Sequence, residues 1–148
     1  MPSKARPPES RPGSITAVID PVAALASGTL EGNLYLYDTN KAEGSTGFGT
    51  LDLRTRVRSG DRIIWNVVVL ECETYAALDG IVIDEKFCAP ERKIYPSTDI
   101  AYWTATVKRH VTEPVSYRLK FRLGTVTEPY AISTPALVGQ SAAGRGHR

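Results

Sequence analysis

The sequence is poor in the residues that staple small scaffolds and that build most catalytic centres. Its 148 residues include only two cysteines, Cys72 and Cys88, and two histidines, His110 and His147. Two cysteines are too few for a disulfide framework, so we expect a reduced pair, with a bridge between them as the less favoured alternative. Metal catalysis needs several imidazole or carboxylate ligands at one site, which one histidine in the body of the chain does not supply. We therefore expect no metal and no other cofactor.

Common motifs of nucleophilic catalysis and of phosphate binding are missing as well. There is no Gly-X-Ser-X-Gly sequence, and the glycine-rich run 44–49 lacks the lysine and the helix of a phosphate loop. The cysteines have one candidate base in the body of the chain, His110. These gaps favour a protein that is not an enzyme.

Long apolar runs and a charge of one sign are also lacking. No run of about 18 apolar residues predicts a transmembrane helix, so we expect no membrane partner. The 18 basic and 16 acidic side chains leave a net charge of +2, which is too small to indicate nucleic-acid binding. Basic residues precede the apolar segment 15–26 as in a signal peptide, but Asp20 and Pro21 interrupt it. We interpret that segment as a first strand and expect a cytoplasmic protein.

The chain does contain a strong pattern of alternating apolar and polar residues. In the segment 50–58, Leu51, Leu53, Thr55 and Val57 alternate with one acidic and three basic residues, which is typical of a half-buried strand. The sequence Ser59-Gly60-Asp61 then predicts a tight turn, with glycine at a positive φ and aspartate bonding back to the turn amides. We expect this turn to join 50–58 to an antiparallel strand at 62–70.

Similar short runs predict an all-β fold. We expect an antiparallel two-sheet β-sandwich of the jelly-roll or immunoglobulin-like kind, with about seven or eight strands. The candidate strands are 15–20, 33–38, 50–58, 62–70, 80–86, 101–109, 115–123 and 130–137. The segment 21–26 is too short to predict more than a turn of helix. A proline-rich arm at 1–14 and a tail at 139–148 are expected to be disordered, which leaves a β-sandwich domain at 15–138.

Several motifs between about 45 and 125 resemble one known family. Gly49, Leu51 and Leu53 precede the sequence Gly60-Asp61-Arg62-Ile63-Ile64-Trp65. Further on come Tyr102-Trp103-Thr104-Ala105-Thr106-Val107, Thr112-Glu113 and then Tyr117, Leu119 and Phe121. In order and spacing, these motifs are similar to those of the bacterial AidA/PixA inclusion-body proteins. The resemblance implies a compact bacterial β-sandwich made in large amounts, some of whose relatives accumulate as intracellular inclusions, and it implies no catalytic residues.

Two rows of basic side chains form the first candidate site. One row comprises Arg54, Arg56 and Arg58, and the other comprises Arg118, Lys120 and Arg122. If the two strands were neighbours, their outward sides would form one positive field able to hold a phosphate, a sulfate or an acidic glycan. The alternative is the solvated side of a sheet, whose charges discourage edge-to-edge aggregation.

Aromatic side chains form the second candidate site. We expect Trp65 and Trp103 to be buried because they lie in strongly apolar segments. Tyr35, Tyr37 and Tyr75 are freer to be exposed, where they would join two subunits or bind a ligand. The sequence thus predicts a non-enzymatic protein that acts by self-association as a homo-oligomer. The alternative is a lectin-like module that binds a carbohydrate or an anion.

Overall fold

The computed structural model describes residues 12–71 and 73–139. Cys72, His147, the arm up to residue 11 and the tail from residue 140 therefore lie outside the described part, which leaves the expectations about them untested. None of the helices in the described part is long and apolar enough to cross a membrane.

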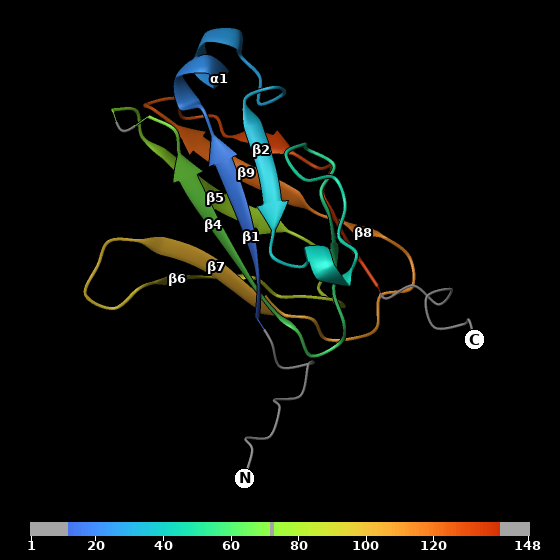
Figure 1. Ribbon diagram of the computed structural model, residues 1–148. Helices are drawn as coiled ribbons and strands as arrows, with labels where there is room; N and C mark the ends of the chain where they lie inside the picture. The colour runs from blue at the N-terminus through green and yellow to red at the C-terminus, as the bar shows by residue number, and fades with distance from the viewer. Residues whose placement is uncertain (1–11, 72, 140–148) are drawn as a thin grey trace.

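The structure consists mainly of β-strands, as expected (Figure 1). In chain order its elements are β1 (Pro12–Ile19), α1 (Pro21–Ser27), β2 (Leu34–Asp38), the 3-10 helix η2 (Lys41–Glu43), β3 (Arg54–Arg56), β4 (Arg62–Val69), β5 (Ala76–Val82), β6 (Glu91–Ile94), β7 (Ala101–Thr106), β8 (Val115–Ser116), β9 (Arg118–Leu123), β10 (Tyr130–Ile132) and β11 (Ala136–Val138). They form a five-stranded sheet in the order β2-β1-β4-β7-β6 and two three-stranded sheets, β10-β9-β5 and β3-β11-β8.

This arrangement differs from the expected sandwich in two respects. The strands are divided among three sheets rather than two, and two of the sheets are mixed rather than antiparallel. The five-stranded sheet has β1 parallel to β4 along its whole length, and β3 is parallel to β11. Both parallel pairs join segments far apart in the sequence, so alternation within each segment could not reveal their direction.

The turn at residues 59–61 has the expected chemistry but joins different partners. Gly60 has a φ of 96°, and the Asp61 carboxylate accepts the Arg58 amide at 2.8 Å. However, β3 and β4 do not pair with each other, because β3 lies beside β11 and β4 lies between β1 and β7. The expected hairpin is therefore wrong, and the turn carries the chain from one sheet to another.

Other strand boundaries also differ from the expected ones. The expected strand at 115–123 is divided into β8 and β9, the one at 130–137 into β10 and β11, and the one at 80–86 begins earlier as β5. The strand β6 was not expected at all, because its sequence Glu-Arg-Lys-Ile shows no apolar alternation. The segment after β1 is a seven-residue helix rather than a single turn, because the Asp20 carboxylate accepts the Ala23 amide at 3.1 Å and Pro21 occupies a first-turn position.

The buried core includes residues of all three sheets, and Figure 1 shows β5 and β9 behind β1, β2 and β4. The inward face expected in 50–58 is confirmed for Leu53, Thr55 and Val57, whereas Leu51 is only partly buried. Tyr117, Leu119, Phe121 and Leu123 are buried as well. Trp65 is buried as expected, whereas Trp103 is only partly buried.

Two polar atoms in this core have no hydrogen-bond partner. The rings of Trp65 and Tyr117 meet edge to face with their centroids 5.7 Å apart. Burial raises the pKa of Tyr117 far above its usual range, and the nearby Trp65 indole lowers it by a smaller amount. Even so, neither the indole N–H nor the phenol hydroxyl makes a hydrogen bond of normal geometry within the described residues. The contact therefore stabilises the core through packing of the two rings.

The core also contains Cys88, one of the two candidate nucleophiles. Its side chain is fully buried and makes no disulfide. Burial raises the pKa of the Cys88 thiol from 9.0 to about 11, although Lys108 partly opposes this effect. A thiol that keeps its proton at neutral pH is a poor nucleophile, so this cysteine acts as a small apolar core residue.

Replacing Tyr117 with phenylalanine tests the idea that its hydroxyl contributes nothing. We expect the free energy of unfolding to stay within about 1 kcal/mol of wild type or to rise, because no bond is lost. The matched control is Thr55→Val, which deletes a buried hydroxyl that donates to the Asp38 carboxylate at 2.7 Å. The control should cost about 1–3 kcal/mol in urea unfolding. Equal losses in the two variants would contradict this account.

The pKa of Cys88 predicts how stability changes at alkaline pH. Between pH 9 and 11 the unfolded thiol loses its proton while the folded thiol keeps it, so the free energy of unfolding falls as the pH rises. The full effect is about 3 kcal/mol in the free energy of unfolding. Because lysine and tyrosine titrate in the same range, the measurement is the difference between wild type and Cys88→Ala. The wild type should lose more stability than the variant from pH 8 to pH 10.5, and parallel curves would refute the prediction.

Candidate functional site

The structure does not bring the two basic rows onto neighbouring strands. Arg54 and Arg56 lie on β3, which belongs to the sheet β3-β11-β8, and Arg58 follows β3 in the turn. The second row lies on β9, in the sheet β10-β9-β5; it comprises Arg118, Lys120 and Arg122. The condition for one continuous positive field is therefore not met.

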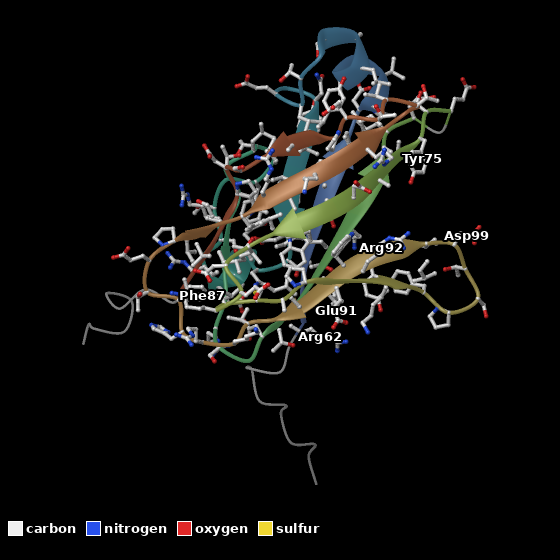
Figure 2. All side chains as sticks on the ribbon, turned by 180° about the vertical axis from the view of Figure 1, so that it is seen from behind. Arg62, Tyr75, Phe87, Glu91, Arg92 and Asp99 are labelled. Carbon is white, nitrogen blue, oxygen red and sulfur yellow. The ribbon has the colours of Figure 1, made fainter. Side chains whose placement is uncertain are left out.

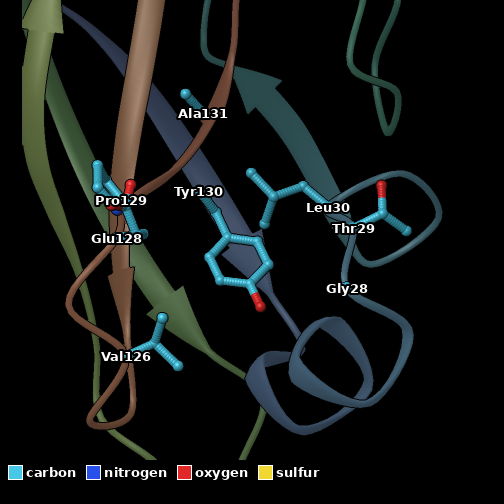
Figure 3. Close-up of a pocket in the computed structure, with 8 residues that line it drawn as sticks. All are labelled: Gly28, Thr29, Leu30, Val126, Glu128, Pro129, Tyr130 and Ala131. Atoms are coloured by element: carbon cyan, nitrogen blue, oxygen red, sulfur yellow. The ribbon is translucent and has the colours of Figure 1, made fainter.

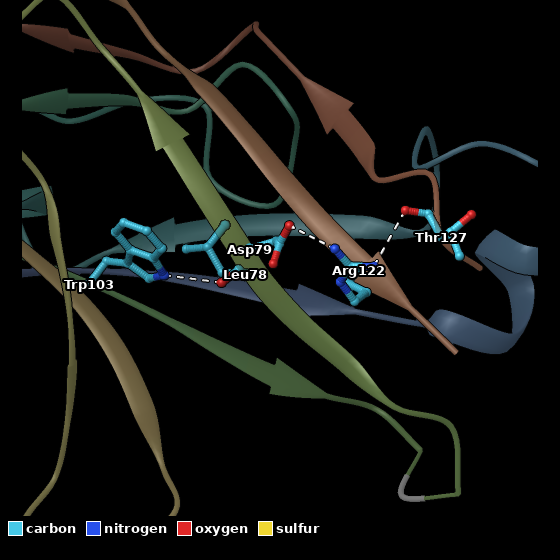
Figure 4. Close-up of polar contacts among 5 residues, drawn as sticks. All are labelled: Leu78, Asp79, Trp103, Arg122 and Thr127. Carbon is cyan, nitrogen blue, oxygen red and sulfur yellow. Dashed lines mark hydrogen bonds and ion pairs between the residues drawn. The ribbon is translucent and has the colours of Figure 1, made fainter. Parts of the chain in front are cut away.

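Three of these arginines have partners within the protein: Arg118 donates to the Ser133 hydroxyl at 3.3 Å, and Arg56 and Arg122 make the contacts that follow. The Arg56 guanidinium donates to the carbonyl of Gly139 and, at 3.4 Å, to the carbonyl of Gly44. Arg122 lies 3.3 Å from the Asp79 carboxylate and donates to the Thr127 carbonyl at 3.4 Å (Figure 4). These contacts tie separate segments together, which gives these side chains a structural role.

The three candidate tyrosines lie on two different segments of the fold. Tyr35 and Tyr37 are on β2, at one edge of the five-stranded sheet, and the Tyr35 hydroxyl donates to the Gly32 carbonyl at 2.9 Å. Tyr75 directly precedes β5, and 59% of it is exposed. The structure therefore separates the three, and only Tyr75 lines a cavity described below.

That cavity lies beneath the hairpin formed by β6 and β7. We call it the hairpin groove; its volume is about 240 Å³, and it is lined by β4, β5 and the hairpin. Its lining includes Trp65, Trp103, Tyr102 and Tyr75, together with Arg92 and Asp99. Figure 2 shows Tyr75 above the hairpin, Asp99 near the hairpin tip, and Arg92 on the side of the hairpin that faces Tyr75.

One hydrogen bond fixes the inner wall of the hairpin groove. The Trp103 indole N–H, on β7, donates to the Leu78 carbonyl on β5 at 3.0 Å (Figure 4). It thus links the five-stranded sheet to the facing sheet. It also occupies a β5 carbonyl next to the point where the register of β5 against β9 shifts, between Leu78 and Gly80.

The hairpin of β6 and β7 is unusually exposed and carries several apolar side chains. Every residue from 91 to 100 is exposed, including Ile94 at 48% and Ile100 at 59%. Tyr95 and Tyr102 stack on each other with their ring centroids 4.3 Å apart. At the tip, Ser97 adopts a φ of 65°, and the Thr98 hydroxyl donates to the Tyr95 carbonyl at 2.8 Å. The apolar side chains are therefore presented by an ordered hairpin.

Two further cavities offer less chemistry. One of about 390 Å³ lies between the end of α1 and the β9–β10 connection, and it contains a single charged side chain, Glu128 (Figure 3). Another of about 350 Å³ borders the start of β6 and is lined by Arg62, Glu91 and Lys108 among others. The Lys108 ammonium already donates to the Glu85 carbonyl at 2.9 Å. Across residues 12–71 and 73–139 no group of three or more histidines, cysteines or acids could hold a metal ion.

Sequence reasoning missed the hairpin as a site. Tyr75, Trp65 and Trp103 were singled out, but nothing indicated that they line the same cavity. The available signal was the run Lys93-Ile94-Tyr95-Pro96, where apolar residues follow charged ones beside a turn-forming proline. The candidate nucleophile and its candidate base lie in different environments, since Cys88 is buried and His110 is exposed.

The fold has a counterpart among solved structures. The crystal structure of the inclusion body protein PixA from Burkholderia cenocepacia J2315 matches with a TM-score of 0.67 and 14% sequence identity. The match covers 95% of this chain and all of PixA. The expected resemblance to PixA is therefore confirmed, and at this identity it is a resemblance of fold.

Comparison at the level of sequence gives a different kind of result. No curated protein matches the chain. A family model described as a domain of unknown function matches residues 12–128, from the start of β1 to the end of the β9–β10 connection. The chain therefore belongs to the family of the domain of unknown function DUF8788.

Proposed function

We propose that this protein is a non-enzymatic structural protein that acts by self-association through the β6–β7 hairpin. The observation that carries the proposal is the set of exposed apolar residues on an ordered hairpin. Ile94, Tyr95 and Ile100 are 48%, 38% and 59% exposed, and Tyr75 across the groove is 59% exposed. Apolar side chains gathered on one exposed element mark an interaction surface, whereas isolated ones are ordinary.

The fold relative supports the same proposal. Its title calls PixA an inclusion body protein, and inclusions form only when copies of a protein contact one another. A protein of the same fold with an exposed apolar hairpin is suited to such contacts. The cytoplasmic location expected from the sequence is part of this proposal.

The state of the candidate nucleophile supports a role without catalysis. Cys88 is buried and its thiol pKa is raised to about 11, so almost none of it is thiolate at neutral pH. The hairpin groove holds one cation and one acid, Arg92 and Asp99, both exposed to solvent. Such groups are suited to binding and orienting a ligand.

A second candidate function is the binding of a small ligand in the hairpin groove. The specific observation is its aromatic lining beside Arg92 and Asp99, which is suited to stacking on a planar or sugar ring while polar groups fix its orientation. This form of the carbohydrate or anion hypothesis uses the hairpin groove rather than the two arginine rows.

Concentration-dependent assembly tests the first function. In sedimentation velocity we expect wild type to form a homo-oligomer at micromolar concentration and Ile94→Asp to shift toward monomer, because a buried charge would face the second copy. The matched control is Val22→Asp on α1, because Val22 is 49% exposed and Ile94 is 48% exposed. The control should assemble like wild type. A wild type that stays monomeric at every concentration would exclude self-association.

Glycan-array binding and calorimetry with Arg92→Gln test the second function. A ligand held in the hairpin groove should lose about tenfold in affinity when the charge-assisted bond is removed. Arg118→Gln is the control, because Arg118 lies on β9, contacts Ser133 and does not line the hairpin groove. Equal losses in both variants, or no ligand at low salt, would exclude a specific groove site.

A further inference from the structure

The strand β6 is the free edge of the five-stranded sheet. Among the described strands it pairs only with β7, and all four of its residues are exposed. The opposite edge, β2, is partly covered, because Leu36 bridges Thr50 and its carbonyl accepts the Gly49 amide at 2.7 Å. On β5, the bulge after Leu78 and the Trp103 bond interrupt another edge. Compared with β2 and β5, the strand β6 is therefore the more regular edge for accepting another strand.

The pairing with β7 determines which β6 backbone groups point outward. The Tyr95 amide donates to the Ile100 carbonyl at 2.9 Å, so this opposed pair is a hydrogen-bonded one. In an antiparallel ladder, hydrogen-bonded and non-hydrogen-bonded pairs alternate. Given the register of β6 on β7, the amides of Glu91 and Lys93 face β7, and those of Arg92 and Ile94 face away from it. These outward groups are the ones that a further strand would bind.

We propose that β6 pairs antiparallel with β6 of a second copy of this chain, in the register that places Arg92 opposite Arg92. This inference rests on the proposed function and names its partner and contact. The two five-stranded sheets then become one continuous sheet across a twofold axis. Such an interface is self-complementary, so it closes as a dimer.

Charge selects this register over its neighbours. With Arg92 on the axis, Glu91 of each copy lies opposite Lys93 of the other, in non-hydrogen-bonded pairs whose side chains are closest. In the next register, Arg92 of each copy would pair with Ile94 of the other. The two Lys93 side chains would then lie opposite each other, which is unfavourable because their charges repel. Backbone bonding does not distinguish the registers, because each engages both Arg92 and Ile94. The two Glu–Lys pairs therefore decide between them.

Apolar contacts favour the same register. It places Ile94 opposite Pro90 of the second copy, which covers a side chain that is 48% exposed in the single chain. Pro90 has no amide hydrogen, so its carbonyl accepts from Ile94 and the ladder stops there. Within one chain Lys93 lies 3.6 Å from Glu91, so both charges are already held on one side of β6.

Two features of β6 oppose its pairing with a second copy, and the effect of one of them can be measured by a substitution. A lysine on an edge strand commonly prevents aggregation, and the register also places two Arg92 side chains opposite each other. The guanidinium groups extend toward the hairpin groove rather than toward the Glu–Lys pairs, since Arg92 and Glu91 lie on opposite sides of the hairpin (Figure 2). Replacing this arginine with threonine should tighten the dimer, because a like-charge contact is removed.

A charge-swap experiment tests the register in the full chain. Glu91→Lys and Lys93→Glu should each weaken the dimer about tenfold or more, because two attractive pairs become repulsive. An equimolar mixture of the two variants should form heterodimers at least as tightly as wild type, since every facing pair is then opposite in charge. The double variant E91K/K93E should recover wild-type affinity. Sedimentation velocity gives the affinities, native mass spectrometry identifies the heterodimer, and circular dichroism confirms that each variant is folded.

The outcomes separate this inference from the proposed function. If wild type assembles but neither swap alters its affinity and the mixture shows no preference, the β6 contact is refuted while self-association stands. If wild type is monomeric throughout, both fail. Amide hydrogen exchange gives a second readout: the Arg92 and Ile94 amides should become protected as the concentration rises, whereas Glu91 and Lys93 are already protected by β7. Unchanged exchange at Arg92 and Ile94 in the assembled protein would also overturn the inference.

Discussion

The unequal width of two facing sheets is the constraint on which the rest of this structure depends. Five strands face a sheet of three, and the contact is held by the Trp65–Tyr117 ring pair and by the Trp103 bond to Leu78. In Figure 1 the narrower sheet lies behind β1, β2 and β4, whereas the hairpin of β6 and β7 extends beyond it. Residues 91–100 are therefore exposed, whereas β7 packs toward β5 through the Trp103 bond.

This mismatch explains why an exposed strand has an ordered shape. Residues 91–94 bury no side chain, so β6 gains little from the hydrophobic effect. Its order comes from pairing with β7, whose inner residues reach the core, and from the hydrogen bonds of the hairpin tip. Since the backbone is already ordered before any partner arrives, binding there would cost less conformational entropy than binding by a flexible loop.

How much of the fold the sequence could predict depended on how each strand is stabilised. Strands with one buried face, such as β2 and β9, show their alternation of apolar and polar residues directly in the sequence. The strand β6 shows no such pattern because it is held by backbone bonds alone. The sequence also could not predict which strands pair, because the pairs β1–β4 and β3–β11 join distant segments whose pairing depends on the whole core.

For the candidate site too, the sequence identified individual residues but could not predict how they are arranged in space. Tyr75, Trp65 and Trp103 were identified as residues of interest from their type, which is local information. That they share one cavity, and that the arginine rows do not share one sheet, follows from topology. The tight turn at Gly60 and Asp61 was predicted correctly for the opposite reason, because turn geometry depends on only a few neighbouring residues.

The charges on β6 have two physical consequences that need not conflict. Charged residues keep an open edge from pairing with any strand that it meets, and they do so most effectively against partners of the same sign. A strand that carries Glu91 and Lys93 on one side nevertheless matches its own copy when the two run antiparallel about Arg92. The same side chains then exclude most partners and admit one. An edge protected in this way would limit association to a defined dimer, and larger assemblies of this protein would have to grow through a second surface.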